Sequence, residues 1–162
     1  MHPILILQLL ILLMVANGTP IFASKLLGDV FARALDGGAI FLDGNPLFGP
    51  SKTIRGVALS LLATPFAAAL MGLGWKVGAL VAVLAVAGDL SSSFVKRRLG
   101  FASSSMAIGL DQIPESLFPL LAARTVLPLS FLDVAAGAVI FFVGQLVLSR
   151  ILFRLRVRDR PY

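Results

Sequence analysis

The chain has 162 residues, of which 58% are hydrophobic and 14% charged, and its mean hydropathy of +0.96 is too high for a water-soluble domain. It has no cysteine, and its one histidine is His2, which excludes thiol nucleophiles, disulfides and zinc–thiolate sites and argues against histidine-dependent chemistry. The net charge of +6 comes without a soluble surface, so we expect contacts with anionic lipid and no nucleic-acid partner.

The length fits a single membrane-embedded domain over residues 1–162, and the hydropathy predicts an all-α integral membrane protein. Five apolar segments are the predicted transmembrane helices, and two polar stretches connect them. Several segments are shorter than the ~20 residues of an ideal span, which a locally thinned bilayer accommodates. In chain order they are Pro3–Ala16, Val57–Leu73, Val77–Phe94, Ser116–Leu129 and Phe131–Phe153.

The first span is followed by a turn sequence, because residues 17–20 read Asn-Gly-Thr-Pro. We expect the Asn17 side chain to donate from this turn into a binding site. The next segment, Ile21–Leu35, carries charges at every fourth position, which predicts an amphipathic helix lying at the membrane interface. A signal peptide is the alternative for the first span, but basic leading residues and a cleavage site are missing.

The first polar stretch, Asp43–Gly56, combines glycines with basic and hydroxyl side chains. Glycines permit close backbone approach, and Lys52, Thr53 and Arg55 supply donors that suit phosphate. The stretch is not a P-loop, because two residues separate Gly49 from Lys52 and no strand precedes it. Basic residues beside a span are often interface anchors, so a turn followed by anchors is the alternative.

The second polar stretch, Gly88–Glu115, begins inside an apolar run. Asp89, Ser93 and Lys96 are spaced i, i+4 and i+7, so they share one helix face. A carboxylate within the hydrocarbon is costly and is usually functional or paired. The alternative is a contact of Asp89 with Ser93 or Lys96 that only satisfies the helix end, followed by a basic topological anchor at residues 96–98.

Two further carboxylates, Asp111 and Glu115, are spaced i, i+4 at the start of the fourth predicted span. They can converge on one metal ion, or they can cap the helix, with Asp111 near the N-cap and Pro114 in the first turn. Together with Asp89 they offer only oxygen ligands, which suits Mg²⁺ bound between carboxylates and phosphate. We therefore predict Asp89, Asp111 and Glu115 as metal ligands.

Basic residues are distributed unevenly over the predicted topology. With the N-terminus outside, Lys76 and Arg124 lie on the outer side, and 12 of the 14 lysines and arginines lie with the polar stretches and the C-terminal tail. This asymmetry predicts a multi-pass cell-membrane protein with cytoplasmic polar loops. The small residues 135–137 permit close helix packing, which leaves a homo-oligomer open. The 12 residues are Lys25, Arg33, Lys52, Arg55, Lys96, Arg97, Arg98, Arg150, Arg154, Arg156, Arg158 and Arg160.

In combination, these motifs resemble the CDP-archaeol synthase family, membrane cytidylyltransferases related to CDP-diacylglycerol synthases. The resemblance covers nearly the whole chain, and its most specific part is Ser-x-x-Lys-Arg followed by an Asp-centred motif. It is carried, in order, by Pro46-Leu47-Phe48-Gly49, Lys52-Thr53-Ile54-Arg55-Gly56, Gly88-Asp89, Ser93-x-x-Lys96-Arg97-Arg98-Leu99-Gly100 and Leu110-Asp111-Gln112.

The resemblance implies a Mg²⁺-dependent transfer of CMP from CTP to a lipid phosphate in the bilayer, giving a CDP-lipid and pyrophosphate. Its nucleophile is a phosphate oxygen that is already ionised, so no general base is needed. By the same resemblance Lys52, Thr53 and Arg55 hold nucleotide phosphates, and Ser93, Lys96 and Arg97 belong to the same cluster. Asp89 and Asp111 are the implied metal carboxylates, and we take Lys96 and Asp111 as the catalytic residues.

The chain departs from the family pattern at one position. Relatives commonly have a second aspartate three residues after the first in the Asp-centred motif, and here that residue is Pro114, followed by Glu115. Either Glu115 replaces the missing aspartate or the metal site is reduced.

Two other classes of membrane protein are alternatives to this enzyme family. A CDP-alcohol phosphotransferase is excluded, because Ala32-Arg33 precedes Asp36-Gly37 instead of following it. The remaining alternative is a non-catalytic lipid- or anion-binding membrane protein, or a transporter subunit. An anchor of that kind has no reason to place acids among its basic residues, so the enzyme is favoured.

Overall fold

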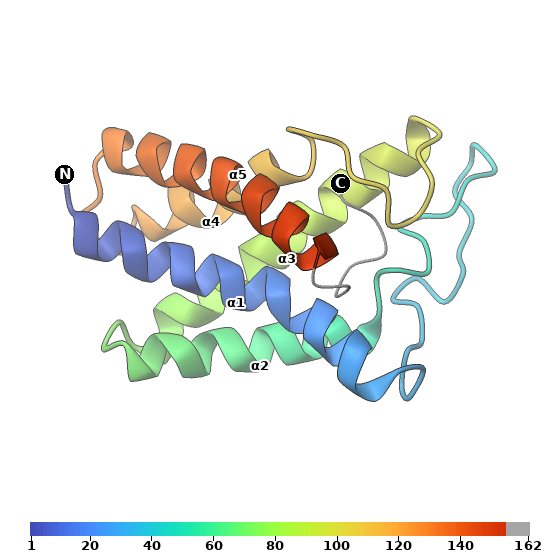
Figure 1. Cartoon of the computed structure of the whole chain (residues 1–162), viewed down its shortest axis with the longest axis horizontal. Coiled ribbons are helices and arrows are strands. Elements are labelled where there is room, and N and C mark those ends of the chain that lie inside the picture. The colour runs from blue at the N-terminus through green and yellow to red at the C-terminus, as the bar shows by residue number, and fades with distance from the viewer. Residues whose placement is uncertain (155–162) are drawn as a thin grey trace.

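The computed structural model describes residues 1–154, which form a bundle of five helices (Figure 1). This confirms the predicted all-helical class. The helices are α1 (Pro3–Leu27), α2 (Ile54–Leu70), α3 (Trp75–Arg98), α4 (Gln112–Ala123) and α5 (Phe131–Arg154).

The helices differ in how much of a bilayer they can cross. Within residues 1–154, α1, α3 and α5 are long and apolar enough to span it, and α2 is apolar but has only 17 residues. The predicted fourth span, Ser116–Leu129, is wrong in its bounds, because α4 has 12 residues and ends at Ala123. At 1.5 Å per residue α4 is about 18 Å long, well short of the ~30 Å hydrocarbon core. After Ala123 the chain forms turns over residues 124–127, and Pro128 follows, so the helix does not continue.

The predicted turn at residues 17–20 is not present, because α1 continues through it to Leu27. Pro20 lacks an N–H, so it leaves the Ala16 carbonyl without its normal helical partner. Ser60 of α2 replaces that partner, since its hydroxyl donates to the Ala16 carbonyl oxygen at 2.6 Å. A hydroxyl on a neighbouring helix thus keeps α1 intact within the apolar bundle.

The interfacial helix predicted for Ile21–Leu35 is also wrong. Its first seven residues belong to α1, and the helix ends at Gly28, which has a positive φ of 51°. Residues 28–35 form successive turns instead. The Arg55 guanidinium donates to the carbonyl oxygens of Gly28 and Val30 and so ties these turns to the start of α2.

Both polar connections lie at the same end of the bundle (Figure 1). We call residues 28–53 the first polar loop and residues 99–111 the second polar loop. The N-terminus and the connections 71–74 and 124–130 lie at the opposite end (Figure 1). The predicted topology places most basic residues on one side of the membrane, which requires both polar connections at one end of the bundle, as the structure has them. Three of the predicted basic residues, Arg156, Arg158 and Arg160, lie outside the described residues.

Small residues set how closely the helices pack. A Cβ added to Gly88 of α3 would lie 2.3 Å from the Pro114 carbonyl oxygen of α4, so only glycine permits this approach. Gly137 of α5 packs against Leu120 and Ile6 within the same chain. Of the small residues 135–137, Gly137 is therefore used inside the bundle while Ala135 stays exposed, and the homo-oligomer stays a prediction.

The first polar loop is organised around the Asp36 carboxylate. It accepts hydrogen bonds from the backbone N–H groups of Gly38 (3.0 Å), Phe48 (2.9 Å) and Gly49 (3.0 Å). Burial acts to raise the pKa of Asp36, but these backbone hydrogen bonds outweigh it and lower the pKa below 3.8. The ionised carboxylate therefore stabilises the loop.

We expect Asp36→Asn to speed hydrogen exchange at the Phe48 and Gly49 amides about tenfold at neutral pH, since a hydrogen bond to a charged group contributes ~1.5 kcal/mol. Because the folded-state pKa is lowered, the stabilisation is complete above the unfolded value of 3.8 and is lost as pH falls through the folded value. The difference from wild type should vanish in that acidic range. Hydrogen–deuterium exchange measures it, with the exposed Asp29 replaced by asparagine as the control.

Candidate active site

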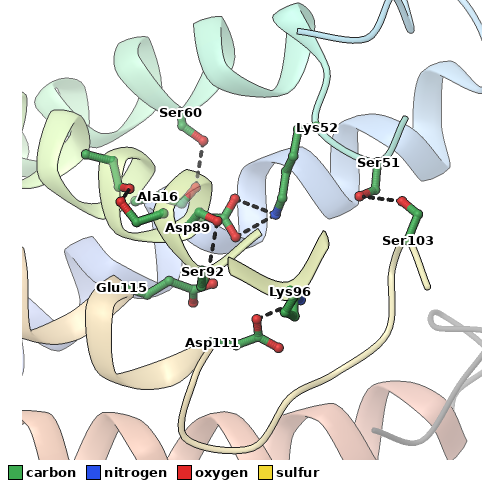
Figure 2. Close-up of polar contacts among 12 residues, drawn as sticks. Ala16, Ser51, Lys52, Ser60, Asp89, Ser92, Lys96, Ser103, Asp111 and Glu115 are labelled. Atoms are coloured by element: carbon green, nitrogen blue, oxygen red, sulfur yellow. Dashed lines mark hydrogen bonds and ion pairs between the residues drawn. The ribbon is translucent and has the colours of Figure 1, made fainter. Parts of the chain in front are cut away.

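A lysine from the first polar loop and an aspartate from α3 form the centre of the site. Lys52 ends the first polar loop, and its Nζ lies 2.5 Å from both carboxylate oxygens of Asp89 on α3 (Figure 2). Asp89 is fourteen residues after the start of α3, about 21 Å along the helix, so it lies within the bundle and not at its rim. The ion pair is with Lys52, and the predicted alternative of Ser93 or Lys96 as the partner of Asp89 is wrong.

A second acid faces Asp89 from α4. Glu115 is 6% exposed, and its carboxyl group is close enough to that of Asp89 for the two to interact electrostatically. The close contact of Gly88 with the Pro114–Glu115 backbone is what brings these two carboxyl groups together. Glu115 also accepts a hydrogen bond of 2.9 Å from Gln145 of α5. The α3, α4 and α5 helices therefore meet at one carboxyl pair.

A separate ion pair joins α3 to the start of α4. The Lys96 ammonium lies 2.7 Å from Asp111 and donates to the Ser105 carbonyl oxygen at 2.9 Å (Figure 2). The other Asp111 oxygen accepts from the Ala107 N–H at 2.8 Å. Asp111 occupies the N-cap position of α4 but makes no side-chain capping bond, so helix capping does not explain it.

The remaining basic residues of α3 hold the polar loops. Arg97 is 5% exposed and donates to the Ala102 carbonyl oxygen at 3.0 Å. Arg98 pairs with Asp43 at 2.5 Å, and its guanidinium lies over the rings of Phe41 (4.8 Å) and Phe94 (4.6 Å). Arg98 is therefore a clamp between the first polar loop and α3.

Four other predicted binding residues have distinct surroundings. Ser93 is buried, at 2% exposure, on the α3 turn between Asp89 and Lys96. Thr53 caps α2 by accepting from the Gly56 N–H at 3.1 Å, and Arg55 is engaged with the backbone of residues 28–30. The Asn17 side-chain nitrogen is buried and has no hydrogen-bond partner among the described residues. The Arg55 Nε is likewise buried and without a partner among the described residues, so Asn17 and Arg55 each keep an unused donor.

A cavity of about 240 Å³ lies between the two polar loops. Residues 45–50 line one side and residues 100–103 the other, and Arg97 lies between them. The loops are bridged by a hydrogen bond of 3.1 Å between the hydroxyls of Ser103 and Ser51 (Figure 2). The cavity therefore has a cation in its wall and is continuous with the basic end of α3.

The predicted three-carboxylate metal site is only partly assembled. In residues 1–154 no group of three acidic or histidine side chains is close enough to hold a metal ion. The structure joins Asp89 with Glu115 and pairs Asp111 with Lys96 instead. Mg²⁺ is commonly bound by one or two carboxylates together with substrate phosphate oxygens, so the oxygen donors of Asp89 and Glu115 fit the ion, and the ligand assignment stays a prediction.

Gln145 is a residue that sequence reasoning missed. It is the only polar residue in the apolar segment 134–148 of α5, and a lone polar residue within a span is itself a signal of function or pairing. Its partner Glu115 is 30 residues away, so the spacing alone did not reveal the contact.

Comparison with known proteins shows where this arrangement occurs. A CarS-like family model, described as CDP-archaeol synthase, matches residues 67–162. The chain is 31% identical to the CDP-archaeol synthase of Sulfurisphaera tokodaii over 158 residues, covering 92% of this chain and 90% of that protein. It is 32% identical to the CDP-archaeol synthase of Pyrobaculum calidifontis over 153 residues, covering 91% of each.

A solved structure has the same fold. It is described as an intramembrane enzyme for archaeal membrane lipid biosynthesis, and it superposes with a TM-score of 0.66 at 29% sequence identity. The match covers 85% of this chain and 90% of that one. The five-helix bundle is therefore that of a multi-pass membrane protein.

Proposed function

The chain belongs to the CDP-archaeol synthase family, a family of CTP-dependent nucleotidyltransferases in lipid biosynthesis, and we propose on this premise that the α3-centred charge cluster is its active site. The observation that carries the proposal is the joining of Lys52, Asp89 and Glu115 inside an apolar bundle, next to the Lys96–Asp111 pair. Such charges are costly at that depth and are retained for chemistry.

Cationic and amide donors would bind the nucleotide and the lipid phosphate. We assign Lys52, Lys96 and Arg97 to phosphate oxygens, because they are the basic side chains nearest the carboxylates and the cavity. The buried Asn17 nitrogen has no partner within residues 1–154 and would be a further donor. The cavity beside Arg97 is placed to take the nucleoside end of CTP.

The acids would hold the metal. Asp89 and Glu115, with Asp111 nearby in the chain, are the ligands we assign to Mg²⁺. When bound, the ion would neutralise triphosphate charge and polarise the α-phosphoryl group. Because Lys52 and Lys96 each adjoin one of these acids, the site balances its own charges before the substrates bind.

The reaction itself needs little general acid–base catalysis. An oxygen of the lipid phosphate attacks the α-phosphorus of CTP, the bond from that phosphorus to the bridging oxygen breaks, and pyrophosphate leaves. The attacking oxygen is already ionised, which agrees with a site built from lysine, arginine and carboxylate. Lysine and arginine donors would stabilise charge developing on the phosphoryl and leaving oxygens.

The reacting groups would face the cytoplasm. The two polar loops share one end of the bundle (Figure 1), and the loops and the adjoining helix ends hold Lys25, Arg33, Lys52, Arg55 and the basic run 96–98, which favours the inner side of the membrane. The hydrocarbon chains of the lipid substrate would stay in the bilayer. The identity of the lipid acceptor and a homo-oligomeric state belong to the proposal, and the assay below tests the acceptor.

Incorporation of label from α-labelled CTP into extractable lipid tests the assignment. With purified protein and a panel of lipid phosphates, including an archaeal ether lipid, we expect a product that requires both Mg²⁺ and Asp111. Asp111→Asn should lower the rate by about 10²–10³-fold, the usual size of losing one charge-stabilising group.

Replacement of the exposed Asp29 by asparagine is the matched control and should leave the rate unchanged. A variant Asp111→Asn with wild-type rate would remove Asp111 from the site. Full activity without any divalent ion would remove the metal from the proposal.

A further inference from the structure

Gln145 is the side chain of α5 that contacts the carboxyl pair. It is the only polar residue in the apolar segment 134–148, and its Nε2 donates to a Glu115 carboxylate oxygen at 2.9 Å. One turn further along α5, Ser149 is also buried, at 2% exposure. Elsewhere on the same pair of helices, Leu120 of α4 packs against Gly137 of α5 through apolar atoms. The Gln145–Glu115 bond is therefore a specific polar link beside apolar packing.

Only one of the two polar atoms of the Gln145 amide, the Nε2 donor, has a hydrogen-bond partner among the described residues. Its Oε1 is buried and has no hydrogen-bond partner among the described residues. A buried, unpartnered acceptor is rarely kept in a helix that faces only apolar neighbours, where leucine or methionine would fill the same space. The amide is thus oriented by one bond, to Glu115, and leaves an oxygen available at the carboxyl pair.

The orientation of Glu115 matters because it faces Asp89. Glu115 is 6% exposed and contacts Asp89 on one side and Gln145 on the other. A carboxylate that binds a metal needs a fixed orientation, which outer partners supply by hydrogen bonding, and losing such a partner typically costs 10–100-fold in metal affinity.

We propose that Gln145 is a positioning residue, which holds the Glu115 carboxylate against Asp89 in the orientation that binds a divalent cation. This proposal rests on the metal-binding role assigned to Asp89 and Glu115 above. Gln145 touches no reacting atom, so it sets the affinity for the ion and leaves the rate at saturating ion unchanged.

The test is Mn²⁺ binding by the full-length protein without nucleotide, followed by the electron paramagnetic resonance signal of free Mn²⁺. We expect Gln145→Met, which keeps the volume and removes the donor, to raise the Kd at least tenfold. Gln145→Asn, whose shorter amide does not reach Glu115, should do the same and serves if the methionine variant does not fold. With Mg²⁺, either variant should need a higher concentration for half-maximal activity and reach the wild-type kcat.

The matched control is Gln8→Met. Gln8 of α1 is a partly buried glutamine whose side-chain amide also donates one hydrogen bond, to the carbonyl oxygen of Met71 at 3.1 Å, and Met71 begins the connection 71–74 at the opposite end of the bundle. This variant should bind Mn²⁺ as wild type does. A double-mutant cycle adds a second criterion, because in a Glu115→Gln background the Gln145→Met change should have no further effect on the Kd.

Two results would overturn the proposal, and they are distinguishable. If wild type binds Mn²⁺ and both Gln145 variants bind it equally well, Gln145 has no positioning role while the metal site stands. If wild type itself binds no Mn²⁺, the metal assignment of Asp89 and Glu115 is wrong, and the proposal for Gln145 is wrong with it. An equal loss in Gln8→Met would show a general effect of removing buried glutamines and would also contradict it.

Discussion

Asp89→Asn is expected to lower kcat/KM by about 10³-fold, because it removes the negative charge that interacts with both Lys52 and Glu115. The Asp89 carboxylate is paired with the Lys52 ammonium at 2.5 Å and faces the Glu115 carboxyl. An asparagine amide keeps the shape but leaves Lys52 without its counter-charge. Labelled-CTP incorporation by the purified variant at saturating Mg²⁺ measures the loss.

Ser91→Ala is the matched control for this prediction. Ser91 lies on the same helix two residues away, is exposed, and uses its hydroxyl only for the Ala87 carbonyl oxygen. We expect this variant to retain the wild-type rate. Loss of less than tenfold in Asp89→Asn would show that the Lys52–Asp89 pair is structural and that the reacting groups lie elsewhere.

Gly88→Ala is expected to abolish most activity without touching any charged group. The new Cβ would lie 2.3 Å from the Pro114 carbonyl oxygen and 2.8 Å from the Glu115 nitrogen, so the backbone of α4 must move away from α3. Overpacking of this kind costs about 1–3 kcal/mol of stability. A displacement of about 1 Å at Glu115 should also cost about 10²-fold in rate.

Gly144→Ala provides the comparison. Gly144 lies in α5, and a Cβ added there meets nothing within 4 Å, so alanine should be neutral or slightly stabilising in the helix. Thermal unfolding and the labelled-CTP assay should separate the two glycines. Equal behaviour of both variants would mean that the α3–α4 approach at Gly88 does not position the carboxyl pair.

Local signals in the sequence predicted the helical segments well where the residues of the segment itself are enough to determine its structure. The apolar segments of α1, α2, α3 and α5 stand out by hydropathy alone, and Asp89 stands out because an acid inside such a segment is costly. Lys52, Lys96 and Asp111 follow from their place in polar stretches of characteristic spacing. In the structure Lys52 pairs with Asp89 and Lys96 pairs with Asp111, and their roles in a common site stay a prediction.

The errors arose where a distant residue changes the local outcome. Asn-Gly-Thr-Pro at 17–20 is a turn by its own chemistry, yet it is helical because Ser60, 44 residues away, satisfies the Ala16 carbonyl that Pro20 frees. The guanidinium of Arg55 donates to carbonyl oxygens of residues 28 and 30, contacts that the sequence did not indicate, and its phosphate-binding role stays a prediction.

The sequence by itself determined that this is a helical membrane protein with its charges gathered into polar loops, because hydropathy and charge act residue by residue. Only the tertiary structure decided which charges meet. Asp89 lies beside Lys52 and Glu115, and Asp111 beside Lys96, since the depth at which α4 begins is set by the contact of Gly88 with Pro114. Such pairings depend on helix packing over long sequence separations, which a periodic pattern along one helix does not encode.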